Sequence, residues 1–223
     1  MFTENQKLEE LLEANPQLIL MLPRFNMDLG FGEKKVNEVC KERNIPCSMF
    51  LTICNVYTYD HYMPTKEDLN SIDGEILVNY LRSSHDYYLN HRLNHIGKHV
   101  EKIADAAGGK IGPALMKFFS DYKEEVAKHF NNEESTLFPQ IYNQENCTKE
   151  YDIKEIADSH TAIFDKLSDM TNIIVKYLPP SLMTNERIGV WFDLTQLTRD
   201  LDKHTKIEEK ILVPFVRKAK GGD

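Results

Sequence analysis

Long apolar runs are missing from this sequence of 223 residues, in which the longest run near the N-terminus covers only residues 18–22. A helix that spans a bilayer needs about 20 consecutive apolar residues. Residues 1–7 also lack the basic and then apolar pattern of a secretory signal peptide. We therefore expect a cytoplasmic protein with no membrane partner.

An excess of positive charge is missing as well. The sequence contains 27 Lys and Arg against 35 Asp and Glu, which gives a formal net charge of −8. Nucleic acids and anionic membrane surfaces attract basic proteins, so this balance argues against nucleic acid as a partner.

The four cysteines lack the CxxC spacing that is typical of many redox and zinc sites. Without an export signal, reduced thiols are expected. Cys40, Cys47 and Cys54 follow one another at seven-residue intervals, but a break at Pro46 separates the first from the other two. A metal or redox site is one interpretation of this spacing. We favour buried structural thiols, since a free cysteine behaves as a small hydrophobic residue.

Two histidine-containing motifs occur in the second half of the chain. Residues 129–139 and 204–214 both read His-x-x-x-Glu-Glu-x-x-Leu-apolar-Pro, at an offset of 75 residues. The same offset relates His85 to His160, each of which follows a serine. The chain therefore contains a duplicated helical hairpin. Each copy carries a lone histidine and then a histidine and a glutamate four residues apart.

Four long amphipathic segments are predicted to be helices, at residues 73–107, 113–141, 149–177 and 184–212. Their short connections predict an all-α protein with an antiparallel up-down four-helix bundle. Shorter helical patterns predict a small helical N-terminal domain before it. The expected limits are 1–59 for this domain, 60–72 for a linker and 73–220 for the bundle.

Six polar residues lie on the apolar stripes of the four long helices, where core residues belong. Counted from the helix ends at about 1.5 Å per residue, they fall in nearly one layer, about 9–18 Å from the same end of the bundle. An unpaired buried carboxylate costs several kcal/mol, so two of them require positive charge, which a metal centre supplies. The six residues are His85, His129, Glu133, His160, His204 and Glu208.

Ligand counting favours two metal ions over one. A single tetrahedral zinc would use four groups and leave two without a role. If Glu133 and Glu208 each bridge two ions and a bridging oxide or hydroxide joins them, the four histidines leave positions open for a small ligand. Mixed imidazole and carboxylate ligands suit iron or manganese better than calcium, and the open positions favour iron. The alternative is a polar core network without metal.

Two other kinds of metal site lack their motifs here. The HExxH motif of zinc hydrolases is absent. The Glu-x-x-His motif of ferritin-like sites is also missing, because Val126 and Leu201 stand three residues before the motif histidines.

Polar residues outside the six could support this centre or form another. Glu125 and Asp200, also 75 residues apart, lie one helical turn before the motif histidines. They are candidate acceptors of hydrogen bonds from histidine N–H groups, and the alternative is solvated helix carboxylates. His91, His95 and His99 could form a second metal patch, but we favour a solvated polar face.

The motifs resemble those of the hemerythrin-like, HHE-type cation-binding family, in which a His and then His-x-x-x-Glu repeat over a four-helix bundle. The resemblance covers residues 73–216. It implies a non-haem di-iron centre with terminal histidines and bridging glutamates. The implied terminal ligands are His85, His129, His160 and His204, and the implied bridges are Glu133 and Glu208.

The layout of the whole chain resembles the repair-of-iron-centres family (RIC, the ScdA/YtfE type), in which a small helical domain precedes the bundle. Residues 25–36 resemble a turn of that domain. The family usually carries adjacent cysteines in this turn, where residues 29–32 here read Leu-Gly-Phe-Gly. The resemblance implies a role in restoring iron–sulfur centres damaged by nitric oxide or oxidants.

Three functions are open on this basis, and enzymatic activity is open with them. The first is a stress-response protein that gives iron to damaged iron–sulfur proteins, or that reduces nitric oxide with electrons from a separate donor. The second is a sensor that binds O2 or NO and signals to a partner through the N-terminal domain. The third is an oxygen store. The resemblance favours the first, whereas the missing cysteine pair favours the second.

Overall fold

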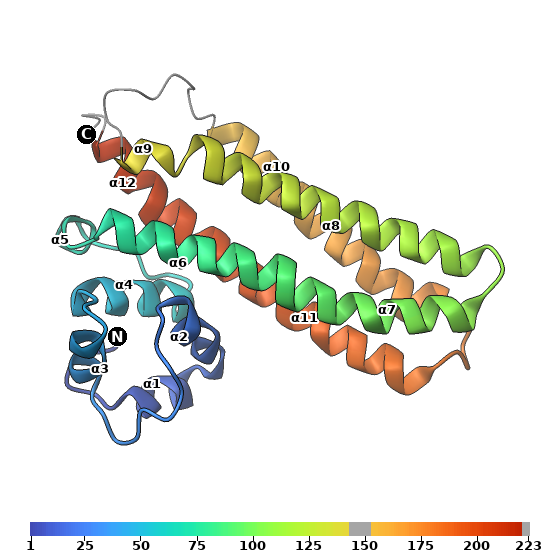
Figure 1. Cartoon of the computed structure of the whole chain (residues 1–223), viewed down its shortest axis with the longest axis horizontal. Coiled ribbons are helices and arrows are strands. Elements are labelled where there is room, and N and C mark those ends of the chain that lie inside the picture. Colours follow the sequence, from blue (N-terminus) through green and yellow to red (C-terminus); the bar gives the residue numbers. More distant parts are fainter. Residues whose placement is uncertain (143–152, 220–223) are drawn as a thin grey trace. The chain divides into compact units, whose positions relative to one another are not determined.

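The computed structural model describes residues 1–142 and 153–219, and the elements named within these ranges are all helices (Figure 1). Packing divides the chain into two compact units. Of the described residues, one unit contains 85–137 and 153–201, and the other contains 1–84, 138–142 and 202–219. None of the described helices is both long and apolar enough to cross a membrane. The prediction of an all-α protein is confirmed.

Residues 85–137 and 153–201 contain four long helices that form a bundle, as the sequence predicts. Helices α7 and α8 make a hairpin, α10 packs against α8, and α11 shares their apolar core (Figure 1). The elements are η2 (Tyr87–Arg92), α7 (Leu93–Ala107), α8 (Ile111–Thr136), α10 (Ile153–Asn172), η3 (Ile173–Tyr177) and α11 (Thr184–Ile207).

The apolar core of this unit follows the predicted stripes on α8, α10 and α11. On α8 the sequence pattern predicts that Phe118 belongs to the stripe, whereas in the structure Phe119 is buried and Phe118 is only partly buried. The core unites apolar side chains from all four helices, among them Ile96, Ile103, Leu115, Val126, Ile163, Leu167, Met170, Val190, Leu194 and Leu197.

The hairpin between α7 and α8 depends on glycines. Gly108 and Gly109 have φ of 58° and 50°, in the left-handed region that favours glycine. Gly112, in the first turn of α8, has another role. A Cβ atom built there would lie 2.3 Å from the backbone oxygen of Ala104. The close approach of the two helices therefore requires a residue without a side chain at position 112.

Three of the predicted helices differ from the helices in the structure. Each difference occurs at a proline or at a π turn. Helix α8 ends at Thr136 because Pro139 has no amide hydrogen to continue it, and Pro139 starts α9 instead. The π turn η2 interrupts the helix predicted at 73–107. The last predicted helix continues past residue 212 through a π turn, η4, into α12. The first four residues of the helix predicted at 149–177 lie outside the described residues.

The unit that contains the N-terminus is a cluster of shorter helices. Leu11, Met21, Val36 and Ile53 are fully buried in it. Its elements are α1 (Leu8–Ala14), η1 (Pro16–Leu20), α2 (Met21–Arg24), α3 (Val36–Glu42), α4 (Cys47–Thr58), α5 (Lys66–Asn70), most of α6 (Gly74–Asp86), α9 (Pro139–Tyr142), η4 (Glu208–Leu212) and α12 (Val213–Ala219).

The predicted linker at 60–72 is anchored at both ends. The carboxylate of Asp60 lies 2.6 Å from Lys203 Nζ and 2.9 Å from Lys206 Nζ. Farther along, Thr65 Oγ1 accepts a hydrogen bond from the backbone N–H of Asp68 and so caps α5. The packing units do not follow the predicted limits 1–59, 60–72 and 73–220, and this domain division stays a prediction.

We expect Gly112→Ala to destabilise the protein, because the new Cβ would collide with a backbone oxygen that cannot rotate away. The free energy of unfolding should fall by about 1–3 kcal/mol. Gly189→Ala is the matched control, since its Cβ would meet no atom within 4 Å in the exposed face of α11. Alanine there should raise stability by about 0.5–1 kcal/mol. Thermal unfolding measures both, and equal melting temperatures would contradict the close approach.

Candidate metal centre

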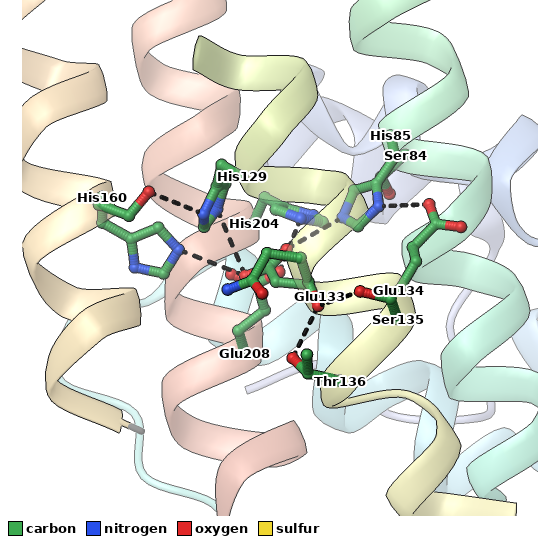
Figure 2. Close-up of polar contacts among 12 residues, drawn as sticks. Ser84, His85, His129, Glu133, Glu134, Ser135, Thr136, His160, His204 and Glu208 are labelled. Carbon is green, nitrogen blue, oxygen red and sulfur yellow. Dashed lines mark hydrogen bonds and ion pairs between the residues drawn. The ribbon is translucent and has the colours of Figure 1, made fainter. Parts of the chain in front are cut away.

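The carboxylate of Glu133 lies at the middle of a buried histidine cluster. Glu133 is 0% exposed, and three imidazoles direct their Nε2 atoms toward it (Figure 2). The distances to the nearest carboxylate oxygen are 3.5 Å from His85, 3.3 Å from His129 and 3.7 Å from His160. These histidines come from α6, α8 and α10, so three helices meet at one side chain.

His204 and Glu208 form a second histidine–carboxylate pair. His204 is the fourth residue from the end of α11 and Glu208 begins the π turn η4, so helical spacing of i and i+4 places them on one face. His204 Nε2 lies 2.9 Å from Glu208 Oε1, and both side chains are buried. This pair repeats the relation between His129 and Glu133 found on α8.

The ligand atoms of these residues fall into two groups that share Glu133. In one, atoms of His129, Glu133 and His160 lie within 4.8 Å of one another. In the other, atoms of His85, Glu133, His204 and Glu208 do so. Each of the six residues predicted as ligands therefore belongs to at least one of the two groups, and each is at most 7% exposed.

The chemistry of these residues fits a metal centre. Four imidazoles and two carboxylates are a mixed nitrogen and oxygen donor set, which suits iron, manganese or zinc and not the all-oxygen preference of calcium. The Nε2 atoms point inward, which is the orientation that a histidine ligand needs. A cation here would also balance carboxylates that are withdrawn from water.

Two of the histidines are oriented by hydrogen bonds to Nδ1, the ring nitrogen that faces away from the carboxylates of the two ligand groups. His85 Nδ1 lies 2.8 Å from Glu134 Oε1, and His129 Nδ1 lies 3.1 Å from Ser159 Oγ. An Nδ1–H that donates to an oxygen leaves Nε2 without a hydrogen and free to bind a metal. The ring of Phe130 stacks on that of His85 at 4.0 Å and 7°, which restricts rotation of this imidazole.

Sequence reasoning missed the roles of Glu134 and Ser159. Both belonged to the repeated pattern, since each motif contains two consecutive glutamates and each lone histidine follows a serine. The pattern did not reveal which residue each would contact. Glu134 and Ser159 reach histidines on other helices, and only the packing of the helices shows those pairings.

Glu125 and Asp200, which were predicted to accept hydrogen bonds from histidine N–H groups, lie in different surroundings. Glu125 forms an ion pair with Lys166 in place of the predicted hydrogen bond to a histidine, since Ser159 occupies Nδ1 of His129. Glu125 lies in a polar pocket of about 610 Å³ whose wall includes His129. Asp200 is buried, and its backbone oxygen accepts a hydrogen bond of 3.2 Å from Tyr88. The role predicted for its carboxylate stays a prediction.

The histidines at 91, 95 and 99 lie outside both metal groups of the described residues. Their side chains are 70%, 52% and 30% exposed. Each approaches a carboxylate: His91 approaches Asp86, His95 approaches Asp193 and His99 approaches Glu186. This arrangement agrees with the favoured interpretation of a solvated polar face.

Comparisons with known proteins agree with this geometry. The model of the hemerythrin HHE cation binding domain matches residues 77–216, which contain all six predicted ligands. The chain is also similar to the iron-sulfur cluster repair protein ScdA of Staphylococcus haemolyticus (strain JCSC1435), with 20% identity over 220 residues. That similarity covers 95% of this chain and 98% of the relative, so it includes the N-terminal helices as well as the bundle. The sequence, the buried histidine–carboxylate groups and the match over residues 77–216 lead to one conclusion: the chain belongs to the hemerythrin HHE cation-binding family.

Proposed function

We propose that this centre holds two non-haem iron ions. The observation that carries the proposal is the position of Glu133, whose carboxylate belongs to both groups of ligand atoms. A carboxylate shared in this way suits a bridge between two ions. Glu208 would be the second bridge, an oxide or hydroxide the third, and the four histidines the terminal ligands.

The similarity to an iron-sulfur cluster repair protein along 95% of the chain supports a role in restoring damaged iron–sulfur centres under nitrosative or oxidative stress. An iron pair would supply iron for transfer or open positions for O2 or NO. Damaged iron–sulfur proteins and an electron donor would be its partners. Donation of iron or reduction of nitric oxide would be its activity, and a cytoplasmic location is the matching expectation.

An O2 or NO sensor is the second candidate. The observation that favours it is the turn at residues 29–32, which reads Leu-Gly-Phe-Gly and has no cysteine pair. A sensor would bind its ligand reversibly and keep its iron.

The anaerobically purified, reduced protein should carry about two iron ions per chain. Glu133→Ala and Glu208→Ala should each lose at least one iron, because each removes a bridging carboxylate. Glu101→Ala is the control, since Glu101 is exposed on α7 and outside both ligand groups. Metal analysis by mass spectrometry measures the content. Full retention of both irons in the Glu133 and Glu208 variants would disprove the bridging roles.

Glu134→Ala should weaken iron binding by about 10–100-fold, because His85 would lose the partner that orients its ring. Glu134→Gln keeps an oxygen acceptor and should restore most of the affinity. Glu209→Ala is the matched control, since it is the equivalent glutamate of the second motif and is exposed. Competition with a chelator under anaerobic conditions measures the affinity. The same affinity for Glu134→Ala and Glu209→Ala would exclude an orienting role for Glu134.

Iron transfer separates the two candidate functions. The iron-loaded protein, mixed with a cluster protein damaged by nitric oxide, should lose iron and restore that protein's cluster absorption. Glu133→Ala should not do so. A protein that keeps its iron in this assay and binds O2 or NO reversibly would instead be a sensor or store.

A further inference from the structure

A small cavity lies beside the connection between α10 and α11, away from the metal centre. It has a volume of about 330 Å³ and lies where the π turn η3 meets the first turns of α11. Figure 1 shows this connection at the same end of the four-helix unit as the connection between α7 and α8. Ile174 in the cavity wall stands fourteen residues after the predicted ligand His160, which is roughly 20 Å along a helix. The cavity is therefore separate from the metal centre, and the proposed function does not use it.

Most of the cavity wall is apolar and open to solvent. The apolar side chains in it are Ile174, Val175, Pro180, Ile188 and Trp191. Ile174 is fully buried, whereas Val175 and Ile188 are each 50% exposed and Trp191 is 39% exposed. Small-molecule sites are hollows of about 300 Å³ or more with apolar and aromatic walls and few polar groups. The wall therefore suits a ligand with an apolar body.

Arg187 adds a positive charge to this wall. Its Nε donates a hydrogen bond to the backbone oxygen of Ile174 at 2.7 Å, and Nη2 donates to that of Val175 at 3.1 Å. Its Nη1 donates to the backbone oxygens of Pro179 at 2.8 Å and Leu182 at 3.4 Å. These bonds hold the guanidinium in place and use four of its five N–H groups. One N–H of Nη2 is left without an acceptor among the residues that the structure describes.

The carboxylates near Arg187 on α11 pair with cations of another helix. Glu186 lies 2.6 Å from His99 Nδ1 and 3.4 Å from Lys102 Nζ, and Asp193 lies 3.1 Å from Arg92 Nη2. Within the described part of the chain, the acceptors of Arg187 are all neutral backbone oxygens. Of the described residues that line the cavity, Arg187 is the only charged one. A carboxylate is the group that complements a guanidinium best, through a charge-assisted hydrogen bond.

We propose that this cavity binds a medium-chain fatty acid anion. The carboxylate accepts a hydrogen bond from Nη2 of Arg187, and the alkyl chain lies against Ile188 and Trp191. At about 30 Å³ for each water-sized group, the cavity holds roughly ten non-hydrogen atoms, which is the size of octanoate.

Trp191 provides the measurement, because it is the only tryptophan of the chain and lies in the cavity wall. The full-length protein is titrated with octanoate while tryptophan emission is recorded, and calorimetry measures the same binding without relying on fluorescence. We expect a saturable change in emission. The uncharged 1-octanol should bind about tenfold more weakly, because it lacks the charge that Arg187 complements. No octanoate binding by either method, or equal affinity for the two compounds, would overturn the proposal.

Two variants test the charge and the space separately. Arg187→Gln should reduce the affinity for octanoate about tenfold and remove the preference over 1-octanol. Val175→Phe keeps the arginine and narrows the cavity from a half-exposed position, so both compounds should bind more weakly. Tyr177→Phe is the matched control, because it places the same side chain in η3 at an exposed position outside the cavity wall.

Circular dichroism and thermal unfolding check that each variant folds. If Arg187→Gln fails to fold, Val175→Phe alone decides, since its half-exposed position leaves the hydrogen bonds of Arg187 in place. Octanoate affinity that Val175→Phe leaves unchanged would contradict the assignment of the ligand to this cavity. So would an equal loss of affinity in Tyr177→Phe.

A second copy of the chain is the other occupant to test, because Trp191 and Phe192 are exposed beside the cavity. Sedimentation velocity with and without octanoate measures the oligomeric state. Saturable octanoate uptake supports the proposal whether the protein is a monomer or a dimer. A dimer that shields Trp191 from a soluble quencher and takes up no octanoate would show that this face is an interface between copies, and the proposal would be wrong.

Discussion

The buried carboxylate of Glu133 constrains the arrangement of the helices around it. Its oxygens lie 3.3–3.7 Å from the Nε2 atoms of three histidines that come from three different helices. A carboxylate withdrawn from water costs several kcal/mol unless charge or hydrogen bonds compensate it. The helices must therefore keep their imidazoles at one depth and one orientation. The apolar core of the bundle, with Leu115 and Leu194 among its members, holds the helices in that register.

Breaks from regular helix geometry adjoin two of the predicted metal ligands. The π turn η2 starts two residues after His85, and η4 starts at Glu208 itself. A π turn inserts an extra residue in a helical turn and is often found at functional sites. The spacing of His129 and Glu133 is regular α-helix, so the two copies of the motif reach the same donor pair through different backbones.

The two halves of the duplication are alike in their predicted ligands and different in the residues that form hydrogen bonds with the histidines. Glu134 contacts His85, whereas its counterpart Glu209 is exposed to solvent. Ser159 contacts His129, whereas its counterpart Ser84 donates its hydroxyl hydrogen to the backbone oxygen of Tyr80. A repeat in sequence therefore does not ensure equal hydrogen-bond partners for the histidines of the two copies, because those partners come from neighbouring helices whose packing differs.

Sequence-based prediction succeeded for features that lie within one helix, and it failed for contacts between helices. The His-x-x-x-Glu spacing, the 75-residue offset and the apolar stripes were enough to predict the four-helix bundle and to place six polar residues on its inner face. Each of these depends on periodicity within one helix, which a sequence displays directly. The pairing of Glu125 with Lys166 did not follow from the sequence, nor did the contacts of Glu134 with His85 and of Ser159 with His129. They depend on the rotation of one helix against another. The sequence alone thus determined which residues face inward, and only the tertiary structure decided which of them touch, because contacts between helices come from the packing of the whole core.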